Sequence, residues 1–152
     1  MINIHEKTLK DLEFFTVLEQ VSQHTITALG KEAVLHILPF AEEELLLPEL
    51  DYVNEYVSSF ESENHIPNHN FDNVTEKIKR LAIENSFIET DAFLKIATTS
   101  LTINELIKFF KKFKVQFPTF FEVSQKIEFT TYVDDEIKKI IDISGEVKNN
   151  AS

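Results

Sequence analysis

The sequence is poor in glycine and lacks cysteine altogether. Its 152 residues include two glycines, Gly30 and Gly145. A phosphate-binding GxxxxGK[ST] loop needs glycine wherever its backbone approaches the nucleotide. The chain therefore contains no such loop of its own. Without cysteine it forms neither disulfides nor thiolate metal sites.

Long apolar runs are also missing. No stretch approaches the roughly 20 apolar residues that span a bilayer, and the first residues lack the basic and apolar regions of a signal peptide. We therefore expect a cytoplasmic protein with no membrane partner. The apolar content is instead rich in phenylalanine, with 14 Phe, no Trp and one Met. Because a phenyl ring has no polar group, we expect most of these rings in a core or an interface.

The net charge of −11 is unevenly distributed. Residues 1–70 carry 13 acidic and 3 basic side chains, a net charge of −10, whereas residues 71–152 carry 13 and 12, a net charge of −1. An acidic surface repels phosphate. We therefore expect the chain alone to bind nucleic acid poorly, and any DNA contact to come from a local patch.

Apolar residues recur at helical spacing along nearly the whole chain. Gly30 is expected to break one helix before the next begins, and Pro48 to kink a helix or to start one a turn later. The expected helices are 5–24 as a short and a longer piece joined near 13–15, then 31–38, 42–61, 74–86, 90–113, 118–127 and 131–141. This pattern predicts an elongated, all-α, multi-helical fold of six to eight helices in a single domain, 1–152.

Few side chains suggest catalysis or metal binding. His65 and His69 have the spacing of two ligands on one helix face, but Pro67 between them favours a loop. Carboxylates cluster at 42–44 and 134–136, both at expected helix starts, where they stabilise the helix dipole. We therefore expect no catalytic residue, no cofactor site and no metal site in this chain.

The most suggestive surface is a run of lysines between aromatic residues, namely Lys108, Lys111, Lys112 and Lys114. On a helix the first three share one face, while Phe110 and Phe113 share another and are expected to be buried. Lysines among aromatic rings can contact the phosphates and bases of nucleic acid. The alternative is an ordinary amphipathic helix with a solvated basic face.

Several motifs, taken in order, give the chain a resemblance to MutS2-type proteins, which are MutS relatives without the mismatch-reading domains. The motifs are LKDLEF at 9–14, LGKE at 29–32, DAFLKI at 91–96, FPTF at 117–120 and IDISGEVKNNAS at 141–152. The last is similar to the family pattern D-x-x-G-x-[IV]-x-[DN]-x-A-S, which precedes a long lever helix.

This resemblance implies that residues 1–152 are the N-terminal part of a MutS-like helical core. Family members are cytoplasmic homodimeric ATPases of mismatch repair and recombination control that close around branched DNA or, in some lineages, stalled ribosomes. Their ATP and Mg²⁺ bind in a downstream domain, and many carry a C-terminal nuclease. The expected partners are therefore the absent ATPase and lever domains, with DNA or the ribosome bound only by the full dimer.

A second hypothesis is an autonomous acidic helical adaptor that binds a protein partner through exposed Phe residues. A fragment is expected to expose an apolar patch where the absent domains pack, around Phe109, Phe110, Phe120 and Phe121. The reading frame beyond residue 152 distinguishes the two hypotheses.

Overall fold

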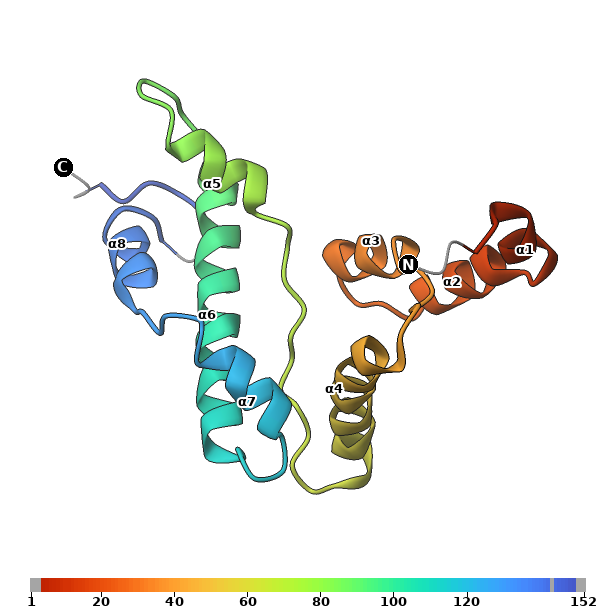
Figure 1. Ribbon diagram of the computed structural model, residues 1–152. Helices are drawn as coiled ribbons and strands as arrows, with labels where there is room; N and C mark the ends of the chain where they lie inside the picture. Colours follow the sequence, from red (N-terminus) through yellow and green to blue (C-terminus); the bar gives the residue numbers. More distant parts are fainter. Residues whose placement is uncertain (1–3, 143, 150–152) are drawn as a thin grey trace. The chain divides into compact units, whose positions relative to one another are not determined.

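The computed structural model describes residues 4–142 and 144–149. Their secondary structure consists of helices and one isolated β-bridge between Ile141 and Val147 (Figure 1). The helices are α1 (Glu6–Asp11), α2 (Phe14–Ser22), α3 (Ala28–Leu35), α4 (Glu43–Glu61), α5 (Thr75–Leu81), α6 (Thr90–Lys112), α7 (Pro118–Ser124) and α8 (Tyr132–Ile140). The predicted all-α fold is confirmed. No helix in the described ranges is long and apolar enough to cross a membrane.

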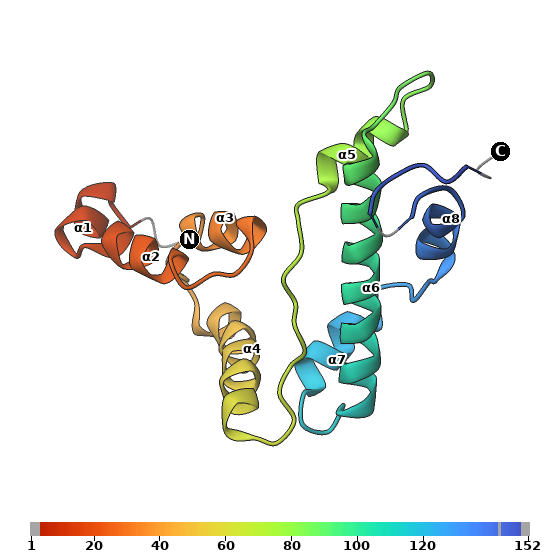
Figure 2. The ribbon, with the colours of Figure 1, turned by 180° about the vertical axis from the view of Figure 1, so that it is seen from behind.

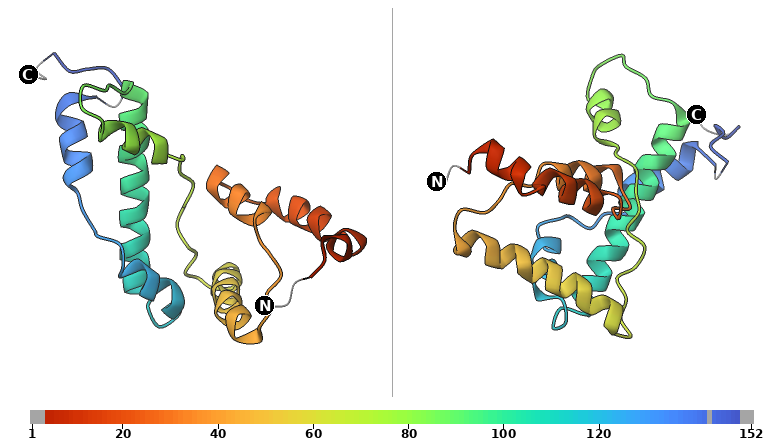
Figure 3. Two further views of the ribbon diagram at one scale, coloured as in Figure 1. Left: turned by 45° about the horizontal axis from the view of Figure 1, so that its top comes forward. Right: turned by 90° about the vertical axis from the view of Figure 1, so that its right-hand side faces the viewer.

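The chain divides into two compact units, Met1–Asn54 and Glu55–Ser152, which are described separately. In the first unit, α1 and α2 pack against each other and α2 packs against α3 (Figure 3). The expected joint between α1 and α2 is confirmed. It lies at Glu13, whose φ of 54° ends one helix before the next begins.

Gly30 does not break a helix, contrary to the prediction, because α3 begins at Ala28 and includes it. The Thr27 hydroxyl accepts a hydrogen bond of 2.9 Å from the Gly30 N–H and so caps the helix. A Cβ at residue 30 would lie 3.1 Å from that hydroxyl oxygen. Glycine therefore leaves room for the cap. Pro48 does not start a helix, because it lies inside α4, which begins five residues before it.

The second unit is built around α6. In Figures 1 and 2, α8 lies beside the N-terminal half of this helix and α7 lies at its C-terminal end. A buried hydrophobic cluster around α6 and α8 consists of Val74, Ile96, Ala97, Ile137 and Ile141. Val74 also precedes the first residue of α5, so the start of α5 is anchored in the same core.

A carboxylate in the last turns of α4 connects this helix to the start of α7. Glu55 accepts hydrogen bonds from the backbone N–H groups of Thr119 (2.7 Å) and Phe120 (3.1 Å). Both N–H groups belong to the first turn of α7, where they have no partner within the helix. Glu55 therefore caps α7 from a position more than 60 residues away in the sequence.

Candidate functional site

The four lysines predicted as a nucleic-acid contact lie around the C-terminal end of α6. Lys108, Lys111 and Lys112 are exposed in its last turns, and Lys114 is exposed just beyond the helix end. None of the four has an ion-pair partner among the residues that the structure describes. The predicted outward orientation of the lysines on α6 is confirmed.

Aromatic rings support two of these ammonium groups. The Lys108 Nζ lies 5.0 Å from the centre of the Phe129 ring, and the Lys112 Nζ lies 4.9 Å from that of Phe113. Such cation–π contacts hold a cation over a ring while leaving its outer side hydrated. The face therefore offers unneutralised positive charge beside aromatic surface.

The opposite side of the same helix turns is buried in a cluster of phenylalanines. Phe110 is 7% exposed, and its ring stacks on that of Phe120 with centroids 5.0 Å apart. Phe117, which is fully buried, lies 6.0 Å from Phe110. The predicted burial of Phe110 is confirmed.

Phe113, in contrast, is only half-buried, although the sequence predicted it to be buried with Phe110. It is the residue that ends α6, and its backbone has already left helical geometry, with φ −109° and ψ 31°. Its ring therefore no longer follows the apolar stripe of the helix. The ring instead lies against Phe109, 4.8 Å away, with Lys112 over it.

The lysine face suits contact with phosphate groups, because free ammonium groups bind them as point charges. Lysines at a helix C-terminus are also favoured by the helix dipole, by about 0.3–1 kcal/mol each. The geometry is thus consistent with both explanations that the sequence left open, a polyanion contact and an ordinary solvated face.

The second feature is a tight turn after α8, within the motif at 141–152. The Asp142 carboxylate accepts hydrogen bonds from the Ser144 hydroxyl (2.7 Å), the Ser144 N–H (2.9 Å) and the Glu146 N–H (3.0 Å). These bonds lower the pKa of Asp142 below its usual value. The bond from the Ser144 hydroxyl has the largest effect, and the bond from the Glu146 N–H has the second largest. The carboxylate thus holds the turn closed in its ionised form.

Gly145 makes this turn possible. Its φ of +87° is a backbone conformation that is strained for residues with a side chain. A Cβ at this position would also lie 3.1 Å from the Leu94 side chain of α6. After the turn, the Lys148 N–H donates to the Ile140 carbonyl at 2.9 Å. The aspartate and the glycine of the motif therefore serve to fold the chain back onto α6 and α8. Positions 143 and 150–152 of the motif lie outside the described residues.

Comparison with known proteins matches almost the entire chain to one group of proteins. An endonuclease MutS2 of Geobacillus sp. (strain WCH70) is 30% identical over 98% of this chain. A putative endonuclease MutS2 of Bacillus subtilis is 25% identical over 98%, and an endonuclease MutS2 of Pelotomaculum thermopropionicum is 24% identical over 97%. This chain is related to the MutS2 proteins.

The match covers only part of those relatives. The chain spans 19% of the length of each of the three MutS2 proteins. No protein-family model matches the chain, and no solved structure matches it significantly. The resemblance stated from the motifs is confirmed at the level of a MutS2-related segment.

The two candidate metal ligands of this MutS2-related segment are engaged elsewhere. The His65 Nδ1 lies 2.8 Å from the Ser59 carbonyl oxygen. The His69 ring contacts the Pro67 carbonyl (3.0 Å) through Nδ1 and the Tyr56 hydroxyl (3.3 Å) through Nε2. Nowhere in residues 4–142 and 144–149 do three potential metal-ligating side chains gather. The histidines instead stabilise the loop after α4.

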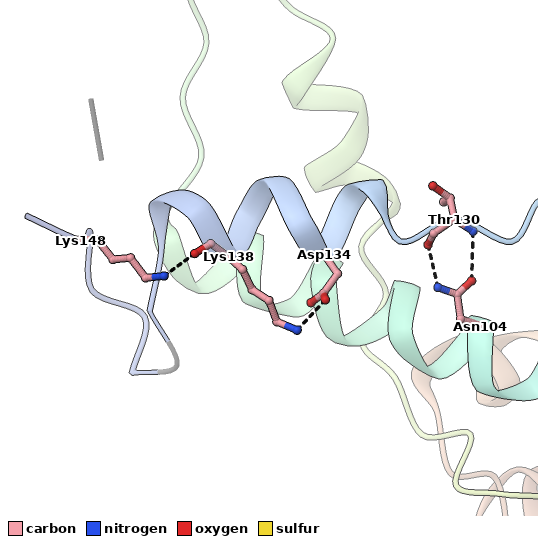
Figure 4. A network of polar contacts seen from close by, with 5 residues as sticks. All are labelled: Asn104, Thr130, Asp134, Lys138 and Lys148. Atoms are coloured by element: carbon pink, nitrogen blue, oxygen red, sulfur yellow. Dashed lines mark hydrogen bonds and ion pairs between the residues drawn. The ribbon is translucent and has the colours of Figure 1, made fainter. Parts of the chain in front are cut away.

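Both carboxylate clusters lie at helix starts, as the sequence suggested. Glu43 and Glu44 occupy the first turn of α4, and Asp134 and Asp135 that of α8. Asp134 is buried, and its Oδ2 lies 2.6 Å from the Lys138 Nζ (Figure 4). Its charge is thus neutralised by a pair one turn along the helix.

Sequence reasoning missed one polar residue of structural weight. Asn104, buried in α6, donates to the Thr130 carbonyl at 2.7 Å and accepts from the Thr130 N–H at 3.3 Å (Figure 4). Both bonds fix the segment before α8 against α6. The available signal was an amide inside an otherwise apolar helical stripe.

Proposed function

We propose that this chain is a non-catalytic core segment of a MutS2-like, ATP-driven DNA-clamping protein. In this role it transmits motion between an ATPase domain and levers that embrace DNA. The observation that carries the proposal is the match of 98% of the chain to 19% of an endonuclease MutS2. A segment of that extent can belong to a motor without containing its catalytic centre.

The packing of the second unit supports a mechanical role. Movement of domains as rigid bodies requires elements whose contacts do not rearrange easily. The core residues between α6 and α8, the two hydrogen bonds of Asn104 and the turn closed by Asp142 fix α6, α8 and the returning chain to one another. Such a body can pass on a displacement applied at the turn.

Apolar side chains are exposed on α1–α3 and on the segments that connect them. Their exposure supports the proposal that further domains of a longer protein cover them. Monomeric soluble proteins seldom expose large contiguous apolar patches. The large side chains exposed in this region are Leu12, Phe15, Val17, Val21, Ile26, Leu29, Leu35, Ile37 and Leu38. The patch expected around Phe109, Phe110, Phe120 and Phe121 is absent, because Phe110 is buried and the other three are half-buried. The rings of Phe109, Phe110 and Phe120 pack in the phenylalanine cluster of α6 and α7 instead.

In the whole protein, ATP with Mg²⁺ and any nuclease activity belong to other domains under this proposal. DNA or a ribosome is bound by the full dimer in the cytoplasm, in mismatch repair, recombination control or ribosome rescue. The lysine face on α6 then contributes at most an auxiliary phosphate contact. A purified chain of residues 1–152 is accordingly expected to hydrolyse neither ATP nor DNA.

The test begins with the gene. A reading frame that continues beyond residue 152 into a lever helix and a GxxxxGK[ST] loop supports the proposal. In that full-length protein, Gly145→Val is expected to distort the turn while leaving basal ATP hydrolysis intact, and to reduce the stimulation of hydrolysis by branched DNA. Unchanged stimulation would argue against transmission through this segment.

The adaptor hypothesis has its own supporting observation, the exposed rings of Phe60 (65%) and Phe87 (76%) in the second unit. A stop codon directly after residue 152 would favour it over the core-segment proposal. ATP hydrolysis by the purified chain that is lost in a His65→Ala or His69→Ala variant would contradict both.

A further inference from the structure

The connection between α5 and α6 (Figure 1) exposes a phenylalanine ring beside the single arginine of the chain. Phe87 is 76% exposed, and the guanidinium carbon of Arg80 lies 5.6 Å from the centre of its ring. The Ser86 hydroxyl donates to the Arg80 carbonyl at 2.5 Å, and the Ile83 N–H donates to the same oxygen at 3.1 Å. These bonds tie the connection back to the end of α5 and so keep the ring beside the guanidinium.

Arg80 and Phe87 line one hollow of about 640 Å³, which we call the Arg80–Phe87 hollow. Its volume lies in the range of about 300–1,000 Å³ that is typical of ligand pockets. Ile83, Ile88 and Ala92 add apolar surface to its walls. The hollow therefore combines an accessible aromatic ring, apolar walls and a guanidinium group within the second unit.

The hollow is locally positive, although the chain is acidic. Three basic and two acidic side chains line it, a net charge of +1, namely Lys77, Lys79, Arg80, Glu76 and Glu89. Lys79 pairs with Glu76 at 2.7 Å, whereas neither Lys77 nor Arg80 has an ion-pair partner in the part of the chain that the structure describes. These two cations are three positions apart and so share one face of α5. They are available to an anion.

This combination of groups indicates the chemistry of a ligand. A guanidinium binds phosphate through two parallel hydrogen bonds, and an exposed phenyl ring accepts a planar base by stacking. A nucleotide carries both a phosphate and a base. The bases of a duplex must leave their stack to reach a protein ring, whereas those of a single strand reach it directly. The helix dipole favours basic residues at the end of α5, but it does not explain the exposed ring beside them.

We propose that the Arg80–Phe87 hollow binds an unpaired nucleotide of single-stranded nucleic acid. The base stacks on Phe87, and Arg80 and Lys77 hold the phosphate. The proposal goes beyond the role as a core segment, in which nucleic acid is bound by the full dimer. It rests on contacts within the second unit, so its failure would leave the proposed core-segment role standing.

A tryptophan reporter tests the stacking directly. The chain contains no tryptophan, so Phe87→Trp places a single indole in the hollow. We expect a deoxythymidine oligonucleotide of about eight nucleotides to quench its fluorescence saturably at about 0.05 M salt, where screening is weak. The matched control is Phe60→Trp, because that ring is 65% exposed but does not line the hollow. Its fluorescence should stay nearly constant.

Affinity for a fluorescein-labelled oligonucleotide of the same sequence separates the ring from the charge. Phe87→Ala should lower the affinity at least about fivefold, as expected for the loss of one base–aromatic stack. Its helical circular dichroism should be unchanged, because the ring is exposed. Arg80→Gln should also lower the affinity and reduce the salt dependence by about one phosphate contact. Arg80→Lys should retain that salt dependence.

Equal affinity of Phe87→Ala and the wild type would overturn the proposal, because the strand would then be held elsewhere, for example on the lysine face of α6. Equal quenching in both tryptophan variants would also overturn it. So would a duplex, or thymidine monophosphate at the same concentration, that quenches Phe87→Trp as strongly as the single strand does. A blue shift of the Phe87→Trp emission on anionic vesicles, without any response to the oligonucleotide, would overturn it in favour of a membrane surface.

Discussion

Replacing Phe110 with alanine should strongly destabilise the second unit. The ring is 7% exposed and lies at the centre of the phenylalanine cluster, 5.5 Å from Phe109, 6.0 Å from Phe117 and 5.0 Å from Phe120 between ring centroids. Truncation would remove the stacked contact with Phe120. It would also leave a cavity between α6 and α7.

The expected cost follows from three contributions. Burying a phenylalanine side chain stabilises by about 1.5–3 kcal/mol, aromatic pairs add about 0.5–1.5 kcal/mol, and the residual cavity costs more because the surroundings relax only partly. Together they give about 3–5 kcal/mol, in the range measured for Phe→Ala in cores. This is a large part of the roughly 5–15 kcal/mol that stabilises a domain.

Urea unfolding followed by helical circular dichroism measures this cost. With a slope of about 2 kcal/mol per molar urea, the midpoint should fall by roughly 1.5–2.5 M. The matched control is Phe87→Ala, because that ring is 76% exposed and makes one cation–π contact, with Arg80. It should cost less than about 1 kcal/mol. Equal, small losses for both variants would refute the assignment of Phe110 to the core.

Three further outcomes are expected. Glu55→Gln should cost about 0.5–2 kcal/mol in the same urea assay, because it weakens the cap on α7; a neutral effect would mean that the cap adds no stability. The hydrogen bonds to Asp142 lower its pKa in the folded chain. The stability that they add is therefore present above the pKa of Asp142 in the unfolded chain, and it is lost as the pH falls through the pKa of Asp142 in the folded chain. Amide NMR shifts of Ser144 and Glu146 should therefore change below about pH 4, and not in Asp142→Asn. DNA binding by the chain should be weak and salt-sensitive, and should decrease further when Lys108, Lys111, Lys112 and Lys114 are changed to glutamine; submicromolar binding at about 0.15 M salt would contradict this.

Much of the helical framework could be predicted from the sequence, because helical periodicity is a local signal. The start of α6 at Thr90, the start of α7 at Pro118 and the loop from His65 to Asn70 all follow from such signals. The burial of Phe110 opposite the lysines followed from the same periodicity. Gly30 was misjudged, because a threonine cap three residues earlier outweighs the weak helix propensity of glycine.

What could not be predicted depends on partners distant in the sequence. No local pattern shows that Glu55 of α4 accepts hydrogen bonds from the backbone N–H groups of Thr119 and Phe120, because these residues lie more than 60 positions away. For the lysines of α6, the sequence predicted position and exposure correctly, since both are set within one helix. Their binding role stays a prediction.

The reach of Glu55 across the second unit also has a consequence for how that unit folds. Contacts of α6 with α7 and α8 join segments close in sequence, whereas the cap closes a loop of more than 60 residues. Closing a longer loop costs more chain entropy, so α6, α7 and α8 are expected to assemble before α4 attaches. Interactions formed after the transition state govern the unfolding rate. The Glu55 cap is therefore expected to form after the transition state. Its loss should speed unfolding while leaving the refolding rate nearly unchanged.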